Sequence, residues 1–166
     1  HSAAPQLEEI FPVFEKLARE HDFTLRIVGA GKDYEIPGVH VDNRSWNLER
    51  EVHDFRSLDI GVCPLFEDEW SSGKPGFKPH IYMACGLPQV STPLGGVCGF
   101  LKHKENGFFA HGHAEWAEHL QDMLRSPELR QSMGTQARED FLRGPNLENQ
   151  TPRLFEDLRR SVSVAA

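Results

Sequence analysis

Two lysines and two glycines lie close together near the middle of the chain, in a composition that suits phosphate binding. The segment reads Ser71-Ser72-Gly73-Lys74-Pro75-Gly76-Phe77-Lys78 and leads into a short predicted helix, Lys78 to Cys85. Free N–H groups and the positive dipole end of a helix N-terminus attract anions. The Gly-Lys-Ser/Thr ending of a Walker A loop is absent. These residues alone fit a phosphate site or a flexible surface loop equally well.

Two further glycine-rich segments follow predicted strands. Gly29-Ala30-Gly31 comes after Phe23 to Val28 and lacks the third glycine of a dinucleotide loop. It fits a tight turn that lets a ligand approach the backbone, with Lys32 as a solvated charge. Thr92-Pro93-Leu94-Gly95-Gly96 follows a second strand. A simple turn is enough to explain its glycines, so by themselves they are weak evidence for a site. Together the loops make a joint anion site more plausible than either does alone.

The sequence gives little support for a metal site or for catalysis by a nucleophilic cysteine. His111 and His113 form a single His-x-His, and no Cys-x-x-Cys pair occurs, so no metal site is predicted. Cys63 and Cys85 lie in apolar runs as core residues do. Only Cys98, in a glycine loop, is placed for exposure and reactivity.

Aromatic and acidic residues border the same loops. Trp46 and Trp70 could stack on a base or a sugar, and ordinary packing explains them equally well. The acidic run Glu67-Asp68-Glu69 suits sugar hydroxyls better than phosphate.

Alternating short strands and helices are expected to position these loops. The predicted strands span residues 23–28, 39–41, 59–65, 87–91 and 107–109. The predicted helices cover residues 4–20 with a kink or late start at Pro12, the stretch after Asn47, residues 78–85, the surroundings of Trp116, and the segments opened by Ser126-Pro127 and Thr151-Pro152. Residues 66–77 are expected to be loop.

This alternation predicts an α/β fold with a parallel, Rossmann-like sheet and helices on both faces. Ligands of such sheets bind beyond the carboxyl ends of the strands. The loops at 29–33, 64–78 and 92–99 all follow strands, so they should share that edge.

Length and charge narrow the classes of function. The 166 residues predict one domain, and the net charge of −7 argues against a nucleic-acid-binding protein. No apolar run reaches the length of a membrane span and no secretory signal opens the chain. An odd number of cysteines, three, fits a reducing cytoplasm.

An ordered set of segments resembles the donor-binding half of a GT-B glycosyltransferase of the group 1 (family 4) type. The segments are Lys74-Pro75-Gly76-Phe77-Lys78, Tyr82-Met83-Ala84-Cys85-Gly86-Leu87-Pro88, Thr92-Pro93-Leu94-Gly95-Gly96 and Glu105-Asn106-Gly107-Phe108. Trp46 with Leu48-Glu49-Arg50-Glu51, and Met133-Gly134 with Ala137-Arg138, extend the likeness to nearly the whole chain.

The resemblance implies a bacterial, metal-independent and cofactor-independent enzyme of polysaccharide biosynthesis that transfers sugar with retention of anomeric configuration. Lys74 and Lys78 would act on the leaving diphosphate. The donor-binding residues would be Gly29, Gly31, Gly73, Gly76, Phe77, Ile81, Thr92, Gly95 and Gly96.

Residues 1–166 would then be one donor-binding domain that lacks its first strand and the N-terminal acceptor domain. The acceptor domain is an expected partner, and the acceptor itself is a glycan or a lipid-linked molecule. The complete enzyme would be cytoplasmic, with peripheral membrane association through the missing half. The final helix would cross back to the other domain.

Two departures from the family pattern keep other functions open. Many relatives carry two glutamates where this chain has Gly73 and Ile81, and a further one where it has Gly99. A subgroup with Lys-Cys-Gly-Phe-Lys in the loop also lacks the first glutamate, and Lys74 is then its conjectured replacement. The alternatives are a catalytically degenerate domain used for protein contacts and a sugar-nucleotide epimerase.

Overall fold

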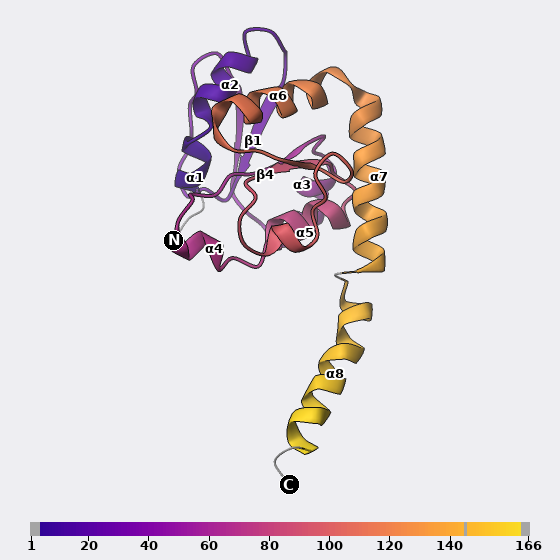
Figure 1. Cartoon of the computed structure of the whole chain (residues 1–166). Helices are drawn as coiled ribbons and strands as arrows, with labels where there is room; N and C mark the ends of the chain where they lie inside the picture. Colours follow the sequence, from indigo (N-terminus) through magenta and orange to yellow (C-terminus); the bar gives the residue numbers. More distant parts are fainter. Residues whose placement is uncertain (1–3, 145, 164–166) are drawn as a thin grey trace.

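Short parallel strands alternate with helices as far as residue 112, and the rest of the chain is helical (Figure 1). The computed structural model describes residues 4–144 and 146–163. The elements are α1 (Ala4–Glu8), α2 (Phe11–Leu17), β1 (Thr24–Val28), β2 (His40–Arg44), α3 (Glu51–Arg56), β3 (Gly61–Cys63), α4 (Glu69–Ser72), α5 (Phe77–Ala84), β4 (Gln89–Ser91), the 3-10 helix η1 (Gly95–Gly99), β5 (Phe108–Phe109), α6 (Gly112–Arg125), α7 (Pro127–Arg143) and α8 (Leu147–Ser163).

The strands are parallel, as the alternation predicts, but they form two sheets instead of one. β1 pairs with β2, from Thr24 opposite His40 to Val28 opposite Arg44. The second sheet has the order β3-β4-β5. Among the described residues, no strand joins β1 to β3.

Helices cover both faces of this α/β, Rossmann-like arrangement. α2 packs against α6 on one side, and α5 packs under β3 and β4 on the other. Gly61 of β3 makes the second contact possible, because a Cβ there would lie 2.6 Å from the ring of Tyr82. α7 lies against α5.

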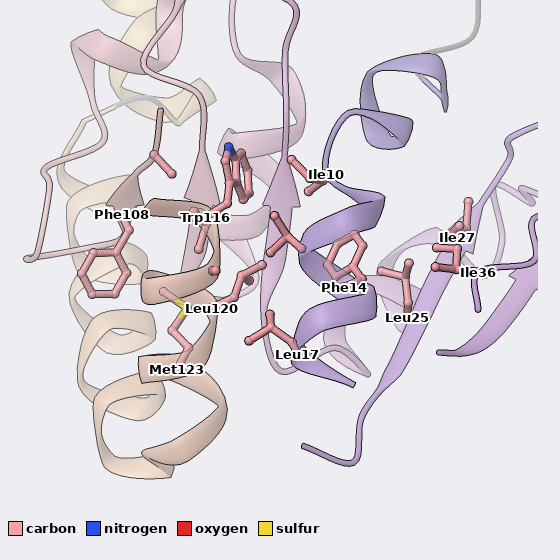
Figure 2. Close-up of a cluster of buried hydrophobic side chains, with 14 of the residues drawn as sticks. Ile10, Phe14, Leu17, Leu25, Ile27, Ile36, Phe108, Trp116, Leu120 and Met123 are labelled. Atoms are coloured by element: carbon pink, nitrogen blue, oxygen red, sulfur yellow. The ribbon is translucent and has the colours of Figure 1, made fainter. Parts of the chain in front are cut away.

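The core lies between α2, α6 and the strands (Figure 2). Phe14 and Leu17 of α2 meet Trp116 and Leu120 of α6, all of them buried. Burying each such side chain contributes about 1.5–3 kcal/mol. This cluster fixes the strands whose carboxyl ends carry the loops.

The N-terminal helical region is interrupted just before Pro12, where the proline predicts a disturbance. α1 ends at Glu8 and α2 begins at Phe11, so Pro12 lies in the first turn of α2. A proline there removes an N–H that has no partner in the helix anyway. The single helix predicted over residues 4–20, with a kink or late start at Pro12, is therefore found as two shorter helices, the second of which ends at Leu17.

Two helix starts differ from the predictions. α3 begins at Glu51, because Asn47 caps a separate turn by accepting the N–H of Glu49 (2.8 Å). Residues 66–77 are not all loop, because Asp68 accepts the N–H of Ser71 (2.7 Å) and so begins α4.

For the two C-terminal helices, the predicted start of α7 is confirmed and the predicted start of α8 is wrong. Ser126 accepts the N–H of Leu129 (3.1 Å) and α7 starts at Pro127. α8 starts earlier than Thr151-Pro152, because the side chain of Asn146 accepts the N–H of Asn149 (2.9 Å). Pro152 therefore lies inside α8. None of the described helices combines the length and the apolar character that a membrane crossing needs.

Candidate functional site

A cavity of about 640 Å³ opens at the carboxyl ends of β1, β3 and β4. Gly29 and Ala30 line it after β1, Pro64 and Leu65 after β3, and Thr92 and Leu94 after β4. The segment Lys74 to Pro79 forms another part of its wall. The three loops expected to share one sheet edge therefore meet around one cavity.

The start of α5 is shaped by Gly76. This residue has a φ of 78° in the left-handed region, where side chains are strained. A Cβ would also come within 2.9 Å of the Phe100 ring. The Nδ1–H of His80 donates to the Gly76 carbonyl (3.1 Å), and burial lowers the pKa of His80. The neutral imidazole thus helps to hold the turn.

Lys74 and Lys78 both line the cavity. Lys74 lies on the turn that precedes α5, and Lys78 lies in the first turn of α5. Burial raises the pKa of the nearby Cys63 thiol to about 11, and the charges of Lys78 and Lys74 oppose that rise. Neither lysine forms an ion pair with any residue that the structure describes. Two ammonium groups near α5's N-terminus favour an anion at this place.

Gly95 and Gly96 support the lysine turn from behind and do not line the cavity. The N–H of Gly96 donates to the Lys74 carbonyl (2.8 Å). A Cβ on Gly95 would lie 2.6 Å from the same oxygen, and one on Gly96 would lie 2.5 Å from the Pro75 oxygen. The two glycine loops are therefore packed backbone to backbone.

The remaining predicted residues fall into two groups. Phe77, Ile81, Thr92 and Gly29 belong to the cavity wall, whereas Gly31 and Gly73 do not. Gly73 is the C-cap residue of α4. Thr92 is buried and its Oγ1 accepts the N–H of Leu65 (3.0 Å), so its hydroxyl joins two of the loops.

Trp46, on the loop after β2, also lines the cavity. Its side chain is 55% exposed, and its Nε1–H donates to Glu51 (3.0 Å). Gly29 allows the approach, since a Cβ there would lie 3.0 Å from the Cβ of Trp46. From the sequence, Trp46 is placed beside these loops but Glu51 is assigned no role at the site.

The acidic run lies beside this cavity. Glu67, Asp68 and Glu69 line a second hollow of about 400 Å³ together with His111. Hydrogen bonding from Ser71 lowers the pKa of Asp68, and the charge of Lys74 contributes less. Asp68 is thereby occupied as a helix cap.

Arg26 and Asp54 line the cavity and were missed by the sequence reasoning. Asp54 lies in α3 and is 5% exposed. One described group, Glu118, His119 and Asp122, could hold a metal ion, and it lies on α6 away from the cavity wall.

Comparison with known proteins identifies the family. A family model described as "Glycosyl transferases group 1" matches residues 6–126. The chain belongs to this family. The loops around the cavity, from Gly29 to Leu94, fall entirely within the matched region.

Curated relatives of this glycosyl transferase chain are longer proteins. N-acetyl-alpha-D-glucosaminyl L-malate synthase of Bacillus anthracis is 25% identical, over 93% of this chain and 43% of its own length. D-inositol 3-phosphate glycosyltransferase of Paenarthrobacter aurescens is 32% identical, over 78% of this chain and 31% of its own length. The chain thus spans less than half of either relative.

Solved structures share the fold. Sucrose-phosphate synthase of Thermosynechococcus elongatus has a TM-score of 0.72 at 17% identity, covering 96% of this chain and 44% of that one. The C-terminal domain of a group 1 glycosyl transferase, LpcC, of Francisella tularensis has a TM-score of 0.60 at 15% identity, covering 85% and 80%. The HepE protein of Anabaena, crystallised with UDP and glucose, has a TM-score of 0.60 at 16% identity, covering 74% and 32%.

Proposed function

We propose that this glycosyl transferase chain binds a nucleotide-diphosphate sugar in the cavity at the strand ends. The observation that carries the proposal is the placement of Lys74 and Lys78 on the cavity wall at the start of α5, without an acidic partner among the described residues. A diphosphate is the donor component with matching charge. The complex of HepE with UDP and glucose supports the choice by analogy of fold.

Bound there, the diphosphate is stabilised as the leaving group. When the bond between the anomeric carbon and the diphosphate oxygen breaks, the bonding electrons leave on that oxygen. The ammonium groups of Lys74 and Lys78 and the first N–H groups of α5 provide fixed positive charge at that place. No metal ion or cofactor is required in this scheme, which retains the anomeric configuration of the sugar.

The acceptor and the rest of the enzyme enter this proposal from the family. We infer that an N-terminal domain supplies the acceptor site, that the acceptor is a glycan or lipid-linked molecule in polysaccharide biosynthesis, and that the enzyme works in the cytoplasm with peripheral membrane contact. The lengths of the curated relatives leave room for such a domain.

Calorimetric titration of the chain with UDP, GDP and ADP tests the proposal. We expect one diphosphate to bind clearly more tightly than the other two. An absence of binding for all three contradicts the proposal and favours a second candidate, a degenerate domain for protein contacts. That candidate follows from the resemblance, by which Gly73 and Ile81 would stand where many relatives carry glutamates.

A further inference from the structure

The charged side chains that line the cavity are distributed unevenly over the two sheets. Lys74 and Lys78 lie beside the sheet of β3, β4 and β5, since the Lys74 carbonyl accepts the N–H of Gly96 in the loop after β4 (2.8 Å). Trp46 and Glu51 lie at the other sheet, on the segment that leads from β2 into the first residue of α3. The cavity therefore has a cationic side and a side that carries a carboxylate.

Glu51 keeps a negative charge that no neighbouring cation balances. Two other charged side chains line this side of the cavity, and both are ion-paired, Arg26 with Asp42 (2.8 Å) and Asp54 with Arg44 (3.3 Å). Within the described ranges, Glu51 forms no ion pair. A half-buried carboxylate in this position favours a ligand group that donates hydrogen bonds.

The indole of Trp46 fixes where this carboxylate lies. Its Nε1–H donates to Oε1 of Glu51 (3.0 Å). An indole N–H lies in the plane of its ring, so the carboxylate is at the edge of the ring and not over its face. Trp46 lines the cavity and is 55% exposed. A planar base that stacks on this ring therefore has its own edge next to Glu51.

The Glu51 carboxylate has acceptor sites left for such a base. An ionised carboxylate accepts at about four lone-pair sites, and the indole N–H uses one of them. The Watson–Crick edge of guanine presents two adjacent donors, N1–H and N2–H, which match the two oxygens of one carboxylate. Uracil has one N–H between two carbonyls, and adenine has an amino group beside an acceptor nitrogen. Both would bring an acceptor against the carboxylate, so guanine fits best.

We propose that Glu51 selects guanine, so that the donor nucleotide is a guanosine diphosphate. The base stacks on Trp46, its N1–H and N2–H donate to Glu51, and its diphosphate binds at Lys74 and Lys78. This inference rests on the proposed function, because it assigns the base of the nucleotide that the cavity is proposed to bind. It makes Glu51 a specificity-determining residue.

A purely structural role for Glu51 leads to a different expectation. If the carboxylate only holds the indole, its loss loosens the stacking ring and weakens every nucleoside diphosphate alike. If it binds the guanine edge, its loss affects most the ligand that carries both donors. Inosine diphosphate separates the two roles, because its base keeps N1–H and lacks the 2-amino group of guanine.

Calorimetric titration of the 166-residue chain with GDP, inosine diphosphate, UDP, ADP and inorganic pyrophosphate tests the assignment. We expect GDP to bind at least about ten-fold more tightly than inosine diphosphate, because one charge-assisted hydrogen bond is lost with the amino group. UDP and ADP should bind more weakly than GDP by at least the same factor.

Glu51→Gln and Glu49→Gln form a matched pair. Glu49 lies two residues earlier, is exposed and does not line the cavity. Glu51→Gln loses the charge and one of the two acceptor oxygens, so the preference for GDP over inosine diphosphate should fall below about three-fold. Its binding of pyrophosphate should stay at the wild-type value, which also shows that the variant is folded. Glu49→Gln should keep the full preference.

Four results overturn the assignment. Equal binding of GDP and inosine diphosphate, or tightest binding of UDP or ADP, overturns it while nucleotide binding and the proposed function stand. An equal loss for all nucleoside diphosphates in Glu51→Gln would make Glu51 a residue that only positions Trp46. Absence of binding by every nucleotide overturns this inference together with the proposed function.

Discussion

Lys78 is the side chain on which the donor site depends most directly, because it adds its charge to the N-terminus of α5. A charge-assisted hydrogen bond contributes about 1.5–3 kcal/mol. We therefore expect Lys78→Ala to weaken diphosphate binding by roughly ten-fold to a hundred-fold while the fold persists. Titration calorimetry at low salt, where screening is least, measures the difference.

Lys32 provides the control for this substitution. It lies in the neighbouring loop, pairs with Glu8 (3.1 Å) and stays outside the cavity wall. Lys32→Ala should change diphosphate affinity much less than Lys78→Ala. Equal affinities of the wild type and Lys78→Ala would make Lys78 an ordinary solvated residue at a helix start.

Trp46 lines the proposed donor site, where stacking on the base is its expected role. The ring is exposed, held by Glu51 and part of the cavity wall. Stacking of a base on an aromatic ring contributes about 1–3 kcal/mol. Trp46→Ala should therefore weaken the preferred nucleoside diphosphate by roughly five-fold to a hundred-fold and leave inorganic pyrophosphate unchanged.

Trp70→Ala is the matched control for Trp46→Ala, because Trp70 is 76% exposed on α4 and does not line the cavity. Equal losses for nucleotide and pyrophosphate would show that Trp46 shapes the loop and does not bind the base.

The sequence predicted which lysines line the cavity better than it predicted which glycines do. Lys74, Lys78 and Gly76 all line the cavity at the start of α5, and their contact with a phosphate stays a prediction. Gly95 and Gly96 pack under the lysine turn and are not part of the cavity wall, and their contact with the donor stays a prediction. A glycine indicates that space or an unusual φ is needed, but not whether a ligand or another loop occupies the space.

At the scale of elements, local capping chemistry explains both the correct and the wrong helix starts. Ser126 and Pro127 start α7 because no other cap lies nearby. Thr151 does not start α8, because Asn146, five residues earlier in the chain, already caps the helix by accepting the N–H of Asn149. Sequence motifs identify possible caps, and competition between neighbouring caps decides which one the helix uses.

The contact between η1 and the lysine turn is expected to determine both stability and binding. A Cβ on Gly96 would lie 2.5 Å from the Pro75 oxygen, so Gly96→Ala must displace the backbone of the turn. Such overpacking costs roughly 1–3 kcal/mol of the free energy of unfolding. We expect this loss in denaturant titrations, together with weaker diphosphate binding.

Gly99→Ala tests whether the effect is specific to that contact. Gly99 ends the same 3-10 helix, and nothing lies within 4 Å of a Cβ there. Its substitution should leave both stability and binding close to wild type. Equal destabilisation by the two substitutions would assign the effect to the helix itself.

For the molecule as a whole, alternation of elements was sufficient to predict the fold class and the sheet edge that carries the cavity. The division into two sheets was not predicted from the alternation, since each strand pattern is local and the pairing partner is not.

α8 is the least integrated part of the molecule. It projects away from the rest of the structure (Figure 1), and Leu154, Phe155 and Leu158 are each more than half exposed. These three apolar side chains are thus without cover among the described residues. The expectation that this helix crosses to an acceptor domain stays a prediction.

The proposed donor site leads to a final prediction about the activity of this chain. The cavity wall comes from β1, β3 and β4 and their loops, and it offers the donor's diphosphate a charged surface on one side. Transfer also requires an acceptor hydroxyl to be held at the anomeric carbon, because orientation of both reactants provides much of the rate. We expect the purified 166-residue chain to bind nucleotide without transferring sugar to an added glycan. Mass spectrometry of the glycan after incubation with the nucleotide sugar measures this. A glycan extended by one sugar would contradict it, whereas hydrolysis of the donor would not, since water needs no acceptor site.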